Sequence, residues 1–138
     1  IDASAGYYVD VNGSSSQTPC VTGTWQNQTG QDGCMNASVG HYVDTNGSTA
    51  QTPCGLGTWN NMTGQPDCTD SSPGYYVDTN GSTTQTPCGL GAWQNQSGQT
   101  SCTNASAGHY VAGTLLTAVE MTFGWRHACA ILNDGSGA

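Results

Sequence analysis

The sequence predicts a mainly β fold, an elongated and disulfide-stapled repeat array without a large globular core. Three observations predict it: a 34-residue period, regularly spaced cysteines and a scarcity of large aliphatic side chains. A fixed period of roughly 20 to 50 residues is typical of linear arrays in which each unit contacts its neighbours. We therefore expect a rod made of short strands and turns.

Glycine marks this period and divides each unit into two equal halves. The glycines that open the halves are Gly6, Gly23, Gly40, Gly57, Gly74, Gly91 and Gly108. We call the spacing between successive members of this series, such as Gly6 and Gly23, the half-period. An aromatic ring stands two positions after each glycine, and tyrosine alternates with tryptophan. These rings are Tyr8, Trp25, Tyr42, Trp59, Tyr76, Trp93 and Tyr110. The unit is therefore a Tyr half followed by a Trp half.

The period also gives the organisation of the chain. A lead-in covers residues 1–5, and three repeats cover residues 6–39, 40–73 and 74–107. Residues 108–138 hold a partial repeat and a C-terminal tail. Because the chain begins at Ile1 without a signal-like segment, we expect a mature or truncated product.

The composition excludes several classes of protein. One cation stands against nine acids, which argues against nucleic acid and anionic membranes as partners, because both are bound by cations. No apolar run approaches the roughly 20 residues of a membrane span. Between residues 6 and 107, the aliphatic side chains larger than alanine are too few to build a globular core against the entropy cost of folding. Other bonds must hold the chain together.

Cysteines supply those bonds. Cys20, Cys34, Cys54, Cys68, Cys88 and Cys102 alternate spacings of 14 and 20 residues. A repeating array leaves mainly two pairing registers, and we favour the pairs of spacing 14 because that register includes all six. Each bond then closes a loop of about 15 residues, worth roughly 3 kcal/mol. Zinc is the alternative, but structural zinc uses ligand pairs two to four residues apart, which are absent here. Disulfides indicate an oxidising compartment, so we expect an extracellular or cell-surface protein.

Each half is expected to contain a short strand and a turn. In the first Tyr half, residues 7–9 favour a strand of three to five residues, and residues 12–13 (Asn-Gly) suit a tight hairpin turn. The Trp half has a strand-like pair at residues 24–25 and a second glycine, Gly30. We expect the aromatic rings to pack on the disulfides as a minimal core. The alternative is a ladder of exposed rings that binds sugar.

Eight of the ten asparagines begin an N-x-S/T sequon, which is the acceptor of N-glycans in secreted proteins. They are Asn12, Asn27, Asn36, Asn46, Asn61, Asn80, Asn95 and Asn104. Asp70 replaces asparagine at the equivalent place of the second repeat. A role in turns explains the Asn-Gly-Ser sites but not the hydroxyl residue in Asn-Gln-Thr or Asn-Ala-Ser. We therefore expect covalent N-glycans, and no other cofactor.

The remaining polar motifs do not indicate catalysis or metal binding. Asp10, Asp44 and Asp78 lie in D-x-N-G-S segments, but a calcium loop needs about six oxygens and usually a distant acid, and the repeats have no Glu. These residues are better explained as turn caps. His41 and His109 occupy tyrosine positions and are expected to be strand substitutions. No motif activates a nucleophile, so we expect no enzyme activity and no catalytic or metal-binding residue.

The repeat motif consists of G-x-Y, then T-P-C-x-x-G-x-W, then G-Q-x-x-C. It resembles the GCC2/GCC3, or ephrin-receptor-like, cysteine-rich repeats of extracellular proteins, over roughly Gly6 to Tyr110. Those repeats often carry two more cysteines near the half boundary, where this chain has residues 35–38 and 103–106 instead. The resemblance implies an extracellular repeat domain, here with one bridge per unit.

The tail follows a different pattern. Residues 119–125 alternate apolar and polar side chains, and a second apolar run ends at Asn133-Asp134-Gly135, which predicts a β-hairpin. The segment GWRHACAILNDGS, residues 124–136, resembles the start of a blade of RCC1-like propellers. The seventh cysteine, Cys129, is expected to be an unmatched thiol or to bond to a second copy. The tail is then expected to join copies head to tail by strand addition.

Together these patterns predict an extracellular structural rod, which acts as a surface stalk or as the subunit of a self-assembling filament or fibril. The alternative is the stalk of a recognition or adhesion receptor that carries a C-terminal RCC1-like propeller. A glycan or protein ligand is left open.

Overall fold

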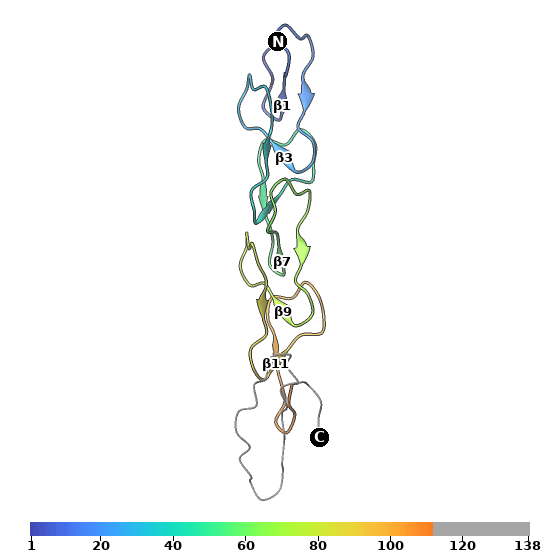
Figure 1. Cartoon of the computed structure of the whole chain (residues 1–138), viewed down its shortest axis with the longest axis vertical. Helices are drawn as coiled ribbons and strands as arrows, with labels where there is room; N and C mark the ends of the chain where they lie inside the picture. Colours follow the sequence, from blue (N-terminus) through green and yellow to red (C-terminus); the bar gives the residue numbers. More distant parts are fainter. Residues whose placement is uncertain (112–138) are drawn as a thin grey trace, which may run out of the picture.

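The computed structural model describes residues 1–111, and its strands form a line of two-stranded antiparallel hairpins along one axis (Figure 1). The strands are β1 (Tyr7–Tyr8), β2 (Thr18–Pro19), β3 (Thr24–Trp25), β4 (Met35–Asn36), β5 (His41–Tyr42), β6 (Thr52–Pro53), β7 (Thr58–Trp59), β8 (Thr69–Asp70), β9 (Tyr75–Tyr76), β10 (Thr86–Pro87), β11 (Ala92–Trp93) and β12 (Thr103–Asn104). The described part contains no helix. The mainly β rod predicted from the period is confirmed, but each strand has two residues and is shorter than expected.

The two halves of a unit fold alike although their sequences differ. We call β1–β2, β5–β6 and β9–β10 the Tyr hairpins, and β3–β4, β7–β8 and β11–β12 the Trp hairpins. Tyr8 faces Thr18 across the first hairpin, and one half-period later Trp25 faces Met35 in the same register. The geometric unit is therefore a single half, and only the chemistry alternates with the full period.

The Asn12-Gly13 turn lies inside a longer loop. Residues 9–17 connect β1 to β2, so the expectation that a tight turn alone joins the two strands is wrong. Gly13 has a φ of 84°, as an Asn-Gly turn requires, and the Ser14 N–H donates to Val11 O at 3.2 Å. The turn is thus present, and it shapes the tip of the loop.

Backbone hydrogen bonds join each hairpin to the next in an invariant pattern. Between the second and third hairpins, Gly23 N donates to Val43 O (2.7 Å) and Gln26 N donates to Ser48 O (3.1 Å). In return, Gly47 N donates to Cys20 O (2.7 Å). The same three bonds recur at each of the five junctions in the described chain, each set shifted by one half-period from the last. Since only main-chain atoms take part, both kinds of half can use this pattern.

Hairpins two places apart also touch, because the glycines that open the halves bring backbones together. A methyl group on Gly23 would overlap the carbonyl oxygen of Gly64, and one on Gly40 would overlap that of Gly81. The same holds for Gly6 and Gly57. These glycines also have positive φ values, 82° at Gly23 for example. The glycine series is therefore required twice over, by conformation and by close approach.

Small side chains, and not the aromatic rings, are the most buried groups of the rod. Cys20, Ala37, Cys54 and Ser71 are each 0% exposed and follow one another at the half-period. Tyr8, Trp25, Tyr42, Trp59 and Tyr76 are half-buried. Further along, Trp93 is 41% exposed and Tyr110 is 71% exposed. Of the minimal core of rings and disulfides that the sequence predicts, Cys20 and Cys54 are fully buried, whereas the rings of the first five halves are half-buried.

In the Tyr hairpins, an alanine or serine and a glutamine replace the disulfide. Ala37 and Gln51 correspond to Cys20 and Cys34 when the sequence is shifted by one half-period. Gln51 Oε1 accepts from Ser38 N (2.6 Å), so its side chain ties the two ends of the hairpin together. Gln17 and Gln85 make the equivalent bonds. Covalent and hydrogen-bonded staples therefore alternate along the rod.

Candidate functional surface

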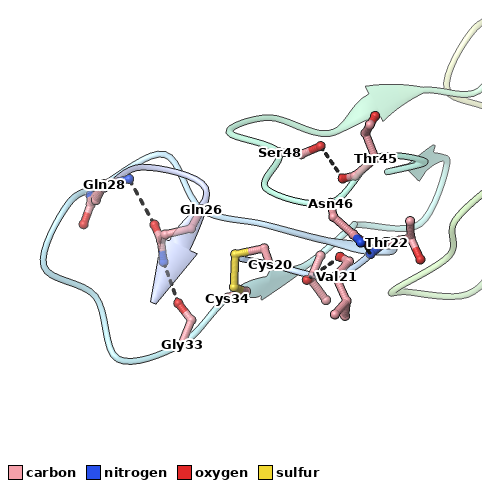
Figure 2. The surroundings of a disulfide bond; sticks show 11 residues. Cys20, Val21, Thr22, Gln26, Gln28, Gly33, Cys34, Thr45, Asn46 and Ser48 are labelled. Atoms are coloured by element: carbon pink, nitrogen blue, oxygen red, sulfur yellow. Dashed lines mark hydrogen bonds between the residues drawn. A yellow bond between two sulfur atoms is a disulfide. The ribbon is translucent and has the colours of Figure 1, made fainter. Parts of the chain in front are cut away.

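The disulfides bond cysteines within each Trp hairpin. They join Cys20 to Cys34, Cys54 to Cys68 and Cys88 to Cys102, the register that the alternating spacing favours. Figure 2 shows the first bridge between the loop from Gln26 to Gly33 on one side and Thr22 with Asn46 on the other. The bridge thus links the base of its own hairpin and lies beside the next one. All six cysteines are occupied by sulfur partners, which leaves none of them for zinc.

The sequon asparagines lie on the exposed surface in three sets. One set is in the loops of the Tyr hairpins, a second is in the loops of the Trp hairpins, and a third is on the outer strands β4 and β12. The sets are Asn12, Asn46 and Asn80; Asn27, Asn61 and Asn95; and Asn36 and Asn104. All eight side chains are exposed, so each has room for a glycan.

A partly buried amide side chain precedes each sequon of the Trp hairpin loops and holds the loop in place. Gln26 Oε1 accepts from Gln28 N (3.1 Å), and its Nε2 donates to Gly33 O (3.0 Å). Asn60 is one methylene shorter, and its Nδ2 donates to His41 O (3.0 Å) instead. The neighbouring asparagine therefore lies at the start of a loop whose conformation is held by these bonds.

The sequons of the Tyr hairpin loops are also in ordered turns. Asn46 is exposed, and its Oδ1 accepts from Thr22 N, just before β3 (2.9 Å), so this bond does not use Nδ2, the atom that carries a glycan. In the same loop the Thr45 hydroxyl donates to Asp44 Oδ1 (2.7 Å). This bond joins two neighbouring side chains, so the role of Asp44 as a turn cap stays a prediction. The described residues contain no cluster of three or more acids, histidines or cysteines that could hold a metal.

Asn36, and Asp70 at the equivalent position of the second repeat, lie against the hairpin two places further along. A methyl group on Gly64 would be 3.4 Å from Asn36 Oδ1, and one on Gly98 would be 3.4 Å from the Asp70 carboxyl carbon. Asn36 and Asp70 are at equivalent positions of β4 and β8. The glycine of the next Trp hairpin loop therefore leaves space for a side chain that rises from the outer strand.

The aromatic rings are poorly placed to form a sugar-binding ladder. Those of the first five halves are half-buried, and Nε1 of Trp25 and of Trp59 is buried without a hydrogen-bond partner in the described part of the chain. A sugar stacks on an open ring face and bonds to its polar edge. This arrangement favours packing as the role of the rings.

The described residues show no pairing of side chains for catalysis. His41 Nδ1 contacts Val39 O (3.1 Å), and no hydrogen bond joins His41 or His109 to an acid or a hydroxyl there. No membrane-spanning helix is present among residues 1–111. The tail, with Cys129 and the expected RCC1-like hairpin, lies outside the described residues.

Sequence reasoning missed two kinds of residue that shape this surface. These are the glutamines that replace the bridges and the amides that hold the Trp hairpin loops. A signal was present for the first kind, since Gln17, Gln51 and Gln85 recur once per period and coincide with a cysteine after a shift of one half-period.

Searches against protein-family models and against curated proteins found no match to this chain. The surface described above therefore carries the functional argument.

Proposed function

We propose that the chain is an extracellular structural rod coated with N-glycans, used as a surface stalk or as a filament subunit. The observation that carries this proposal is the invariant set of backbone bonds at every step from one hairpin to the next. It produces an extended shape from main-chain atoms alone. Eight exposed sequons then distribute acceptor sites along the described length.

The disulfides support an extracellular location. Three bridges within the described part of the chain are stable in an oxidising compartment and rare in the cytosol. Sugar also accounts for solubility, because only 7% of the residues are charged. The rod also exposes apolar side chains to water, among them Val11, Leu56 and Leu90.

Intact mass of the native protein tests the glycan coat. We expect an excess over the 14.2 kDa polypeptide that glycosidase removes. Reduction should then add about six hydrogen atoms for the three internal bridges. A native mass equal to the bare polypeptide would overturn the coat and make the asparagines turn residues.

The filament form of the proposal concerns the tail. Cys129 is the seventh cysteine, and an odd cysteine in a secreted protein suggests a bond between chains. We expect covalent dimers on a non-reducing gel, and we expect Cys129→Ser to remove them while the internal bridges persist. Size exclusion under non-reducing conditions that shows only a monomer would contradict self-assembly and leave a stalk.

A receptor stalk is the second candidate, favoured by the resemblance of residues 124–136 to the start of an RCC1-like blade. The full-length gene separates the two. Several further GWxHxCAIL segments downstream would support the receptor, whereas more GYYVDTNGS units would support the fibre.

A further inference from the structure

The second strand of each Trp hairpin (β4, β8 or β12) has one backbone N–H that points away from the first strand. In β3–β4 the Thr24 N–H donates to Val21 O (2.9 Å), so it does not donate across the hairpin to Asn36. Thr24 and Asn36 therefore form the non-hydrogen-bonded pair, and Trp25 with Met35 forms the bonded one. In an antiparallel ladder the amides of a non-hydrogen-bonded pair point outward. The Asn36 N–H is thus directed to the outer edge.

The residue at this register position follows a pattern along the rod. The six hairpins have Pro19, Asn36, Pro53, Asp70, Pro87 and Asn104 there, in chain order. The Tyr hairpins always have proline, and the Trp hairpins have a sequon asparagine twice and an aspartate once. All six side chains are exposed.

Each of these residues blocks strand pairing in its own way. Exposed strand edges are templates for another chain, and proteins protect them with proline, with charge or by covering them. Proline has no N–H to offer, and the carboxylate of Asp70 repels a second acidic chain. Asn36 and Asn104 have an outward N–H that donates to no acceptor among the described residues. A glycan on these two side chains would cover that edge.

The position of the Asn36 side chain suits this role. Asn36 is exposed, and its Oδ1 would be 3.4 Å from a methyl group on Gly64, so its carbonyl oxygen lies close to that glycine. A glycan bonded to Nδ2 of this exposed side chain would stand beside the edge of β4.

We propose that N-glycans at Asn36 and Asn104, together with the charge of Asp70, keep the Trp hairpin edges from pairing with the same edges of a second copy. The partner that would pair with these edges is a second copy of the chain. Every copy carries three Trp hairpin edges, one in each period, so two rods can match edge to edge. This inference rests on the glycan coat proposed above. It assigns the strand sequons a function that the loop sequons do not have.

The double variant Asn36→Gln/Asn104→Gln tests the inference in a host that glycosylates the parent chain. We expect its weight-average mass in sedimentation to be at least about twice that of the parent at equal concentration, because each lateral pair joins two rods. Negative-stain images should show particles of greater width. Head-to-tail joining would change length instead and is common to all the variants.

Two matched variants complete the test. Asn27→Gln/Asn95→Gln removes two glycans from the loops of the same two hairpins and should sediment like the parent. Asn36→Pro/Asn104→Pro introduces the proline that the Tyr hairpins have at this position. It should return the protein to the association state of the parent, although these two sites then carry no sugar.

The outcomes separate the two proposals. A parent that carries no sugar overturns the glycan coat itself. A glycosylated parent whose Asn36→Gln/Asn104→Gln variant keeps the parent mass and width overturns edge shielding alone. Equal association of both glutamine variants also overturns it, because sugar would then act only through solubility.

Discussion

Replacing Gly23 with alanine is expected to disrupt the rod at its second hairpin and to cost about 4 kcal/mol of unfolding free energy, in the range of severe backbone and packing faults. The added methyl group would overlap the carbonyl oxygen of Gly64, which belongs to the backbone and is fixed by its own hairpin. The positive φ of Gly23 adds strain for any residue with a Cβ. Chemical denaturation monitored by tryptophan fluorescence measures the loss.

Gly30→Ala is the matched control in the same hairpin. Gly30 has a φ of 69°, but a methyl group there meets nothing within 4 Å. Only the conformational strain remains, so we expect a cost of about 1 kcal/mol. Similar losses for the two variants would show that close approach of hairpins two places apart does not constrain the glycine series.

The double substitution Ala37→Cys/Gln51→Cys is expected to form a fourth disulfide and to raise the unfolding free energy by roughly 3 kcal/mol. Ala37 is fully buried like Cys20, and its N–H donates to Gly23 O (2.8 Å) just as Cys20 N donates to Gly6 O (2.8 Å). The backbone register of the two hairpins is the same. Thiol labelling and intact mass before and after reduction detect the bridge.

The reverse exchange, Cys54→Ala/Cys68→Gln, is its control. It converts a Trp hairpin to the staple of a Tyr hairpin, and we expect it to fold and to lose roughly 3 kcal/mol. Reactive thiols in the Ala37→Cys/Gln51→Cys protein would contradict the equivalence of the two halves.

The period, the pairing register and the exposed sequons could be predicted from the sequence because each depends on spacing along the chain. Cysteines separated by 14 positions repeat with the glycines, and a bond pattern in a regular array repeats with them. The positive φ of Gly13 was predictable from its Asn-Gly dipeptide for the same local reason.

The core and the strand lengths could not be predicted in this way. Aromatic rings are the largest apolar groups of the chain, and size suggests a core, but the space at the centre of each rung depends on how closely two hairpins approach. Cys20, Ala37, Cys54 and Ser71 are the residues that are fully buried there. Contacts such as that of Gly23 with Gly64 join residues that are far apart in the chain, and nothing in the local sequence marks them.

The backbone bonds between successive hairpins, together with the close contacts between hairpins two places apart, have a consequence for how the rod unfolds. A hairpin in the middle cannot open without breaking main-chain bonds to the hairpins before and after it and losing its contacts with those one place further. In a linear array such coupling penalises an isolated opened unit. Proteases and hydrogen exchange should therefore attack the array progressively from an end, and interior loops should resist cleavage although many of their residues are exposed.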